Sequence, residues 1–254
     1  FINIGDKIKG YVITEKLNTD SGEAEIYFCE KNDKKYILKY YFKKNFYSDI
    51  IEKIKSINHP NVMNVYEIGT HNKHWYEIDE YYAGGSLDSA LPLEDERAYE
   101  ILNQLNEGLK AIHDVGIIHR DIKAENIYFT DSNKQNVVIG DFGISIVYDQ
   151  KDGVNQVFTE DNAGTEGYRA PEVFNNIVSP SIDYYSLGIT LWNLVEGREP
   201  FVEKSGEVLT SEVIRGKTIN EEIKDFLFSN SLKSTDKTKK IISGLLTNRH
   251  DKRW

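Results

Sequence analysis

The hydrophobic pattern of this 254-residue chain changes its period once, near residue 80, and that change constrains the fold more than any other feature. Before it, short runs rich in β-branched and aromatic residues occupy 11–17, 25–30 and 35–40, and Asn32 and Asp33 form a turn between the last two. After it, apolar residues recur at steps of three and four, which indicates helices. Strands first and helices second predict an α+β fold with two lobes.

Small residues mark the predicted boundary between the lobes. Residues 82–86 read Tyr-Ala-Gly-Gly-Ser, a composition typical of a hinge. We therefore expect an N-lobe over 1–81, this hinge over 82–86, and a C-lobe over 87–254, together forming one domain.

One helix interrupts the strands of the N-lobe. Phe46, Ile50, Ile54 and Ile57 lie at steps of four, four and three, so they share one helical face, and Pro60 follows the pattern. The remaining expected elements are strands at 62–69, 75–79, 127–129 and 137–139 and helices around 98–112, 187–194 and 241–245.

Charge and composition exclude several classes of protein. The chain has 31 Lys and Arg against 41 Asp and Glu, a net charge of −10; residues 1–80 carry 12 Lys against 13 acids, so the remainder carries 19 against 28. This excess of acid argues against nucleic acid or an anionic membrane as the main partner.

No membrane segment or disulfide is expected. The most apolar stretch, 185–195, is far shorter than the roughly 20 residues that span a bilayer, and one cysteine cannot form an internal disulfide. A cytoplasmic location is therefore expected, while the oligomeric state is not indicated. The chain starts at Phe1 without a recognisable signal peptide, as a fragment of a longer protein would.

Four polar clusters stand in a fixed order along the chain. The first, His-Arg-Asp-Ile-Lys-Ala-Glu-Asn at 119–126, puts Asp121, Lys123 and Asn126 on one loop. Neighbouring cations lower the pKa of Asp121, so it stays ionised and can orient a hydroxyl and accept its proton. The second, Asp-Phe-Gly, contributes Asp141, which with Asn126 supplies the hard oxygen ligands that Mg²⁺ on nucleotide phosphates requires. The other two are the strand lysine Lys39 and the segment Ala-Gly-Thr-Glu-Gly-Tyr-Arg-Ala-Pro-Glu at 163–172.

Together these clusters resemble the motifs of the eukaryotic-type (Hanks-type) serine/threonine protein kinase family, HRDxKxxN, DFG, a strand lysine and GTxxYxAPE, over essentially the whole chain. The resemblance implies a bilobal kinase-like fold, with a small β-rich N-lobe holding one main helix and a larger, mainly helical C-lobe. It implies transfer of the γ-phosphoryl group of ATP to a protein hydroxyl, with Mg²⁺, or Mn²⁺ in its place. A pseudokinase-like nucleotide-binding or scaffolding module is the alternative.

The resemblance also assigns roles to individual residues. It implies Asp121 as catalytic base, Lys123 and Thr165 as groups at the transferring phosphate, and Lys39 at the α- and β-phosphates. Asn126 and Asp141 become the metal ligands. The lysine after Asp121 and the threonine of the GT segment follow the serine/threonine pattern rather than the tyrosine pattern. The nucleotide-binding residues implied are Lys39, Ser21, Gly22, Ala24, Ile26, Ile37, Asp79, Tyr81 and Tyr128.

The expected nucleotide site departs from the family pattern in two places. Thr19, Ser21 and Ala24 stand where the family has the three glycines of its phosphate loop, although small residues still let the backbone approach phosphates. Ile37 replaces a small residue above the base, and Tyr128 replaces a common leucine below it, so the pocket is tighter or favours stacking if both side chains line it.

The usual carboxylate partner of the strand lysine is missing. Ile50 stands where the family places a helix glutamate, and Glu52 lies about 200° round the helix from it. Glu77 and Asp79 instead occupy normally apolar positions, Asp79 that of the family's gatekeeper. Our hypothesis is that Lys39 pairs with Glu77 or Asp79. The alternatives are a helix insertion that restores Glu52, or a strand register that exposes both acids.

Regulation and substrate are less constrained. Arg120 before the catalytic aspartate is typical of kinases in which a phosphate on the activation segment docks against arginine, and either Thr159 carries that phosphate or Asp161 mimics it. Glu125 and the acidic C-lobe agree with a protein substrate carrying basic residues, although solvated surface acid explains the same count.

Overall fold

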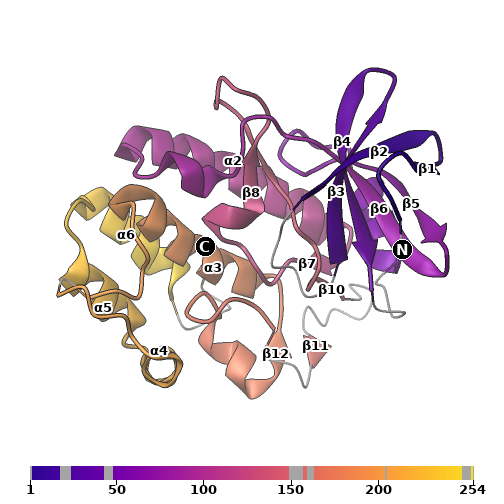
Figure 1. Cartoon of the computed structure of the whole chain (residues 1–254). Coiled ribbons are helices and arrows are strands. Elements are labelled where there is room, and N and C mark those ends of the chain that lie inside the picture. Colours follow the sequence, from indigo (N-terminus) through magenta and orange to yellow (C-terminus); the bar gives the residue numbers. More distant parts are fainter. Residues whose placement is uncertain are drawn as a thin grey trace.

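The computed structural model describes residues 2–17, 24–42, 48–148, 157–158, 163–203, 205–247 and 253. A curled antiparallel sheet forms one end of the molecule and a group of helices the other, which confirms the α+β, bilobal class (Figure 1). The sheet has the order β1-β2-β3-β4-β6-β5. Its strands are β1 (Lys7–Ile8), β2 (Tyr11–Leu17), β3 (Ala24–Lys31), β4 (Lys34–Tyr41), β5 (Val65–His71) and β6 (His74–Glu80).

Alternation along the strands gives this sheet two different faces. Tyr40 on β4 and Tyr76 and Ile78 on β6 are buried in a small core formed within the sheet. Their neighbours point to the opposite face, because successive side chains of a strand alternate. Lys39 on β4 therefore lies on the same face as Glu77 on β6, and this is the face that meets the rest of the molecule.

The expected helix ends earlier than the sequence suggested, and one expected strand begins later; Phe46, the first residue of the helical pattern, lies outside the described residues. Helix α1 runs over Ser48–Lys55, and Ile50 and Ile54 pack into the main core. The strand expected at 62–69 begins only at Val65, because the backbone before it pairs elsewhere: Val62 forms a parallel bridge with Ile139 and joins the N-lobe to the C-lobe.

The C-lobe is built around helix α3 (Ser181–Glu196), whose side chains are buried along nearly its whole length. The other helices are α2 (Asp95–Asp114), α4 (Ser211–Ile219), α5 (Ile223–Asn230) and α6 (Asp236–Leu245). Short strand pairs are β7 (Ile117–Ile118) with β10 (Ile146–Val147), β8 (Ile127–Phe129) with β9 (Val137–Ile139), and β11 (Val157–Phe158) with β12 (Ile177–Val178). Among the described residues, no helix is both long and apolar enough to cross a bilayer.

Two contacts at the ends of α3 tie the C-lobe together. At its C-terminal end, the Glu196 carboxylate accepts hydrogen bonds from Ser231, the backbone N–H of Leu232 and Ser234. Near its N-terminal end, the Arg253 guanidinium binds the Glu172 carboxylate at 2.6 and 3.2 Å.

The segment connecting the lobes contains a glycine for a steric reason. A Cβ on Gly84 would lie 2.3 Å from the carbonyl oxygen of Asp131 and 2.5 Å from the side chain of Phe129 at the end of β8. The small residues that suggested a hinge thus also allow the connecting chain to pack closely against β8. The lobe limits at 81 and 87 stay a prediction.

Candidate active site

The catalytic-loop motif takes its shape from an aspartate on another element. Asp183, in the first turn of α3 and 0% exposed, accepts hydrogen bonds from the backbone N–H groups of His119 (2.9 Å) and Arg120 (2.8 Å) and from the ring of His113 (2.8 Å). These bonds hold Arg120 at a φ of 68°, in the left-handed region, and so set the direction of the next side chain, Asp121. The sequence 183–188 resembles the kinase helix beneath the active site, but sequence reasoning gave Asp183 itself no role.

Three residues surround the Asp121 carboxylate. Thr165 donates to Oδ1 from its backbone N–H at 3.0 Å and from its hydroxyl at 2.6 Å, and Asn126 donates to Oδ2 at 2.8 Å. The Lys123 ammonium lies 3.4 Å from Oδ2 and donates to the Thr165 hydroxyl at 2.8 Å. Although burial acts to raise it, the hydrogen bonds from Thr165 and the charge of Lys123 lower the pKa of Asp121 below its ordinary value.

A glycine is required where Thr165 approaches this loop. Gly164 has a φ of 110°, and a Cβ there would lie 2.6 Å from the carbonyl oxygen of Arg120. Glycine alone combines this backbone conformation with that approach. The glycine before Thr165 therefore allows the chain to come close enough for Thr165 to contact Asp121.

Asn126 and Asp141 offer the oxygen atoms that a divalent cation would need. Both donated hydrogen bonds of the Asn126 amide go to Asp121, at 2.8 Å each, which leaves its side-chain oxygen as an acceptor. Asp141 is exposed and receives no hydrogen bond from any residue that the structure describes. One amide and one carboxylate oxygen fit Mg²⁺, which is held by few protein ligands and completes its shell with water and phosphate oxygens.

Lys39 forms ion pairs within its own sheet. Its Nζ lies 2.9 Å from Oε1 of Glu77, directly opposite on β6, and 3.3 Å from Oδ2 of Asp79. Burial alone would lower the pKa of Lys39, but the two carboxylates raise it well above its ordinary value. The pKa of Asp79 is also raised well above its usual range, by burial and by the like charge of Glu77, and Lys39 offsets only part of this.

Among the ion pairs that the structure describes, those of Lys39 go to β6 and none goes to helix α1. Ile50 is buried in the main core, Glu52 is exposed, and the ammonium of Lys53 is used to donate to the carbonyl of Val115 at 2.9 Å. The hypothesis that Lys39 pairs with Glu77 or Asp79 is therefore confirmed, with both acids as partners. The alternatives, a restored Glu52 and a register exposing the two acids, are wrong, because Glu77 and Asp79 are 2% and 1% exposed.

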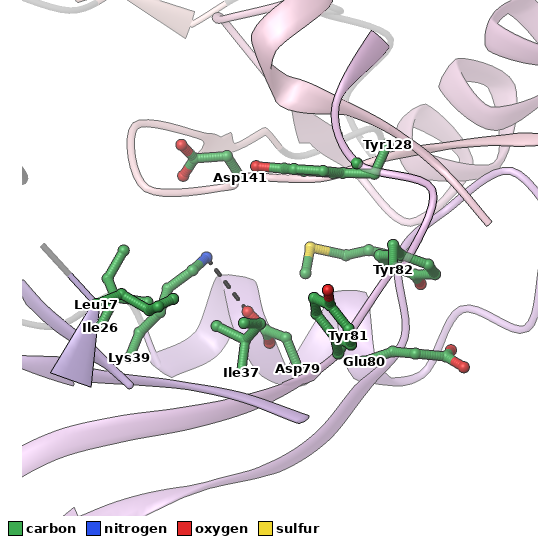
Figure 2. A pocket seen from close by; sticks show the side chains of 12 residues that line it. Leu17, Ile26, Ile37, Lys39, Asp79, Glu80, Tyr81, Tyr82, Tyr128 and Asp141 are labelled. Carbon is green, nitrogen blue, oxygen red and sulfur yellow. Dashed lines mark ion pairs between the residues drawn. The ribbon is translucent and has the colours of Figure 1, made fainter. Parts of the chain in front are cut away.

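A pocket of about 270 Å³ lies between the lobes beside these charges. In Figure 2, Leu17, Ile26 and Ile37 lie on the strand side and the ring of Tyr128 on the opposite side, with Asp141 next to it. The space for this ring comes from Gly140, where a Cβ would lie 2.9 Å from a Tyr128 ring carbon. Two mainly apolar walls that face each other in this way fit a flat heterocycle.

The pocket contains most of the expected nucleotide-binding residues, and more. Ile26, Ile37, Lys39, Asp79, Tyr81 and Tyr128 line it. Ala24 does not: it is buried in β3 opposite Tyr41, beyond the stretch of the strand that reaches the pocket. Sequence reasoning missed Leu17, Met63, Glu80, Tyr82 and Gly85. Leu17 could have been noticed as the last residue of a predicted strand, and Gly85 as part of a glycine pair. Nothing in the sequence around Met63 indicated that it lines a pocket.

Of the expected regulatory residues, the structure describes only Arg120. Its Nε donates to the carbonyl oxygen of Ile144 at 2.6 Å, so the arginine contacts the segment that follows the Asp-Phe-Gly motif. Ser21, Gly22, Thr159 and Asp161 lie outside the described residues. Glu125 is exposed, next to the buried Asn126.

Comparison with known proteins gives a consistent result. The model of the "Protein kinase domain" family matches residues 21–254. Calcium-dependent protein kinase 4 of Plasmodium berghei is 29% identical over 203 residues, covering 77% of this chain and 36% of that protein. A probable serine/threonine-protein kinase of Dictyostelium discoideum is 31% identical over 175 residues, 65% of this chain and 24% of its own. Serine/threonine-protein kinase GIN4 of Saccharomyces cerevisiae is 33% identical over 163 residues, 62% and 14% respectively.

These relatives are much longer than the stretch they share with this chain. The chain spans about a third or less of each of the three.

Proposed function

The chain belongs to the protein kinase domain family, and we propose that it is an active serine/threonine protein kinase that transfers the γ-phosphoryl group of Mg-ATP to a protein hydroxyl. The observation that carries the proposal is the surroundings of Asp121. Its carboxylate lies within hydrogen-bond distance of Thr165 and Asn126 and 3.4 Å from the ammonium of Lys123. A protein that only binds nucleotide has no need for a carboxylate surrounded by these three groups.

Asp121 would act on the substrate hydroxyl. Its lowered pKa keeps the carboxylate ionised near neutral pH, so it can accept a hydrogen bond from the hydroxyl and hold the alcohol oxygen toward the γ-phosphorus. The Lys123 ammonium, 2.8 Å from the Thr165 hydroxyl, would neutralise charge on the transferring group. Phosphoryl transfer asks mainly for such positioning and charge neutralisation.

Asn126 and Asp141 would hold the magnesium ion. A bound Mg²⁺ would offset negative charge on the phosphate groups. The chain contributes the orientation of its ligands, because the two N–H groups of the Asn126 amide are committed to Asp121 and cannot turn toward the metal. Mn²⁺ has similar ligand preferences and would occupy the same position.

Lys39 would bind the phosphates from a fixed position. Its ammonium is held by Glu77 and Asp79 on the neighbouring strand rather than by helix α1. The base would enter the pocket between Ile37 and Tyr128. The substrate would be a protein with basic residues near the acceptor hydroxyl, which the exposed Glu125 beside the catalytic loop and the acidic C-lobe favour. Control by phosphate at Thr159, or by Asp161 in its place, belongs to the same proposal.

The proposal is tested by incubating the protein with γ-labelled ATP, Mg²⁺ and a basic protein, and by measuring label on the acceptor and on the chain itself. We expect transfer by the native chain, a loss of at least 100-fold in Asp121→Asn, and no change in Asp114→Asn, an exposed acid on the same lobe. Transfer that survives Asp121→Asn would refute the assignment of the base.

A second function is favoured by one specific observation. The lysine lacks the helix carboxylate of active kinases, since Ile50 fills that position, and this departure suits a pseudokinase-like module that binds nucleotide without transferring phosphate. Nucleotide binding without label on any acceptor would support that alternative.

A further inference from the structure

Two buried carboxyl groups behind the pocket have oxygen atoms without a hydrogen-bond partner. Within the part of the chain that the structure describes, Oε2 of Glu77 and both oxygens of Asp79 receive no hydrogen bond. Leaving a buried polar atom unpaired costs about 1–3 kcal/mol. Such an atom beside a pocket is therefore a place where a ligand that supplies a donor gains affinity.

The two acids differ in what they face. Glu77 lies directly opposite Lys39 in the strand register, binds it at 2.9 Å and does not line the pocket. Asp79 is opposite Ile37, lies 3.3 Å from the same ammonium and does line the pocket. In Figure 2, Asp79 on β6 lies between Ile37 and Tyr81, and its carboxyl group faces the Lys39 ammonium. Both acids thus contact the lysine, but only Asp79 also lines the pocket, where a ligand can reach it.

Burial and the like charge of Glu77 raise the pKa of Asp79, so both charge states of Asp79 matter for a ligand. The pocket still meets an acceptor in both charge states. An ionised Asp79 offers lone pairs on both oxygens, and a protonated Asp79 whose O–H points toward the neighbouring Glu77 carboxylate offers the lone pairs of its carbonyl oxygen. The polar feature of this wall is a hydrogen-bond acceptor.

The shape of the pocket aligns a base with this acceptor. Ile26 and Ile37 on one side and the Tyr128 ring on the other confine a flat heterocycle to one plane. The edge of that ring system then meets the wall that begins with Asp79. An exocyclic amino group there would donate a hydrogen bond, whereas a carbonyl oxygen would set lone pairs against lone pairs.

We propose that Asp79 is a base-selecting residue: its carboxyl oxygen accepts a hydrogen bond from the exocyclic amino group of adenine, and it disfavours purines with a carbonyl oxygen at that position. This inference rests on the proposed function, because it requires that the pocket hold a nucleotide. It assigns to Asp79 a task separate from that of Glu77, although both contact the same lysine.

The test compares ATP with inosine triphosphate, which carries a carbonyl oxygen in place of the amino group. Dissociation constants of both are measured with Mg²⁺ by calorimetry, for the native chain, Asp79→Leu, Asp79→Asn and Glu77→Gln. The ratio of the two constants cancels effects on the shared triphosphate, including any displacement of Lys39. Glu77→Gln is the matched control, because it removes the same charge from the same lysine outside the pocket wall.

We expect the preference for ATP to fall about tenfold in Asp79→Leu, as befits the loss of one buried hydrogen bond. It should also fall in Asp79→Asn, whose amide can turn its N–H toward a carbonyl oxygen and which decides the matter if the leucine variant does not fold. The ratio should stay within twofold in Glu77→Gln. A native ratio retained in both Asp79 variants would overturn the inference and leave the proposed function intact. A native chain that binds neither nucleotide would overturn both.

Discussion

Removing both carboxylates that face Lys39 should destabilise the protein far more than removing either one. Glu77 and Asp79 place two acids within 2.9 and 3.3 Å of a single ammonium, so the buried group carries an excess negative charge when both acids are ionised. Glu77→Gln or Asp79→Asn leaves one acid and one ammonium, which is a balanced pair. The double variant leaves a largely buried ammonium with no carboxylate among its close partners.

The magnitude follows from this balance. A single neutralisation loses one ion pair but relieves the repulsion between the acids, so we expect each to lower the free energy of unfolding by less than about 1 kcal/mol. Stranding a buried charge costs about 3–5 kcal/mol, and because 17% of the Lys39 side chain is exposed we expect the lower end, about 3 kcal/mol, for the double variant. The coupling between the two substitutions is therefore about 1–3 kcal/mol.

The assay is urea unfolding at pH 7 of the native chain, both single variants and the double variant, analysed as a double-mutant cycle. The matched control is Glu52→Gln, which neutralises the exposed acid on α1 and should change stability by less than about 0.5 kcal/mol. Additive effects, or a Glu52→Gln variant as unstable as the double variant, would refute the reasoning that the sheet rather than the helix holds Lys39.

Three further predictions concern packing and charge elsewhere. Burial acts to raise the pKa of Glu196, but hydrogen bonds lower it from 4.5 to about 2. The ionised carboxylate therefore contributes about 3 kcal/mol to the free energy of unfolding above pH 4.5, and this contribution is lost as the pH falls toward 2. Urea unfolding of Glu196→Gln should show a weaker loss of stability over that pH range, and an unchanged acid dependence would contradict the assignment. Arg253→Met should destabilise the protein by about 3 kcal/mol, because it leaves the buried Glu172 carboxylate without its cation. Adding Glu172→Gln to that variant should recover part of the lost stability in thermal unfolding, and no recovery would count against the ion pair. Gly140→Ala should weaken ATP binding several-fold in a binding titration, because the added methyl group displaces the Tyr128 ring. Adding Tyr128→Leu to that variant should restore ATP binding. A Gly140→Ala variant that binds ATP normally would show that the ring position is unimportant.

Much of the fold could be read from local pattern. The strands at 127–129 and 137–139 have the predicted limits, because each is a short apolar run whose burial is decided by its own residues. The strand predicted from residue 62 begins at Val65 instead. Its first residues were equally apolar, but their backbone partner is Ile139, more than 70 positions along the chain, and no local pattern indicates that.

The candidate site shows the same division. The sequence by itself determined which chemical groups the protein carries, their order, and the alternation in β6 that puts Glu77 and Asp79 on one face, because the period of a strand is a local property. It left three partners for Lys39 open. Only the tertiary structure decided among them, since the choice depends on strand register and on which face of α1 is buried.

Asp183 marks the limit of sequence reasoning. In the sequence, Asp183 is one acidic residue in the first turn of a helix, and its position alone does not indicate what it binds. As part of the folded protein, it holds the backbone of a loop more than 60 residues earlier in the chain and so directs Asp121. The energy of such a contact depends on the separation of atoms in space, and that separation exists only after α3 has packed beneath the loop.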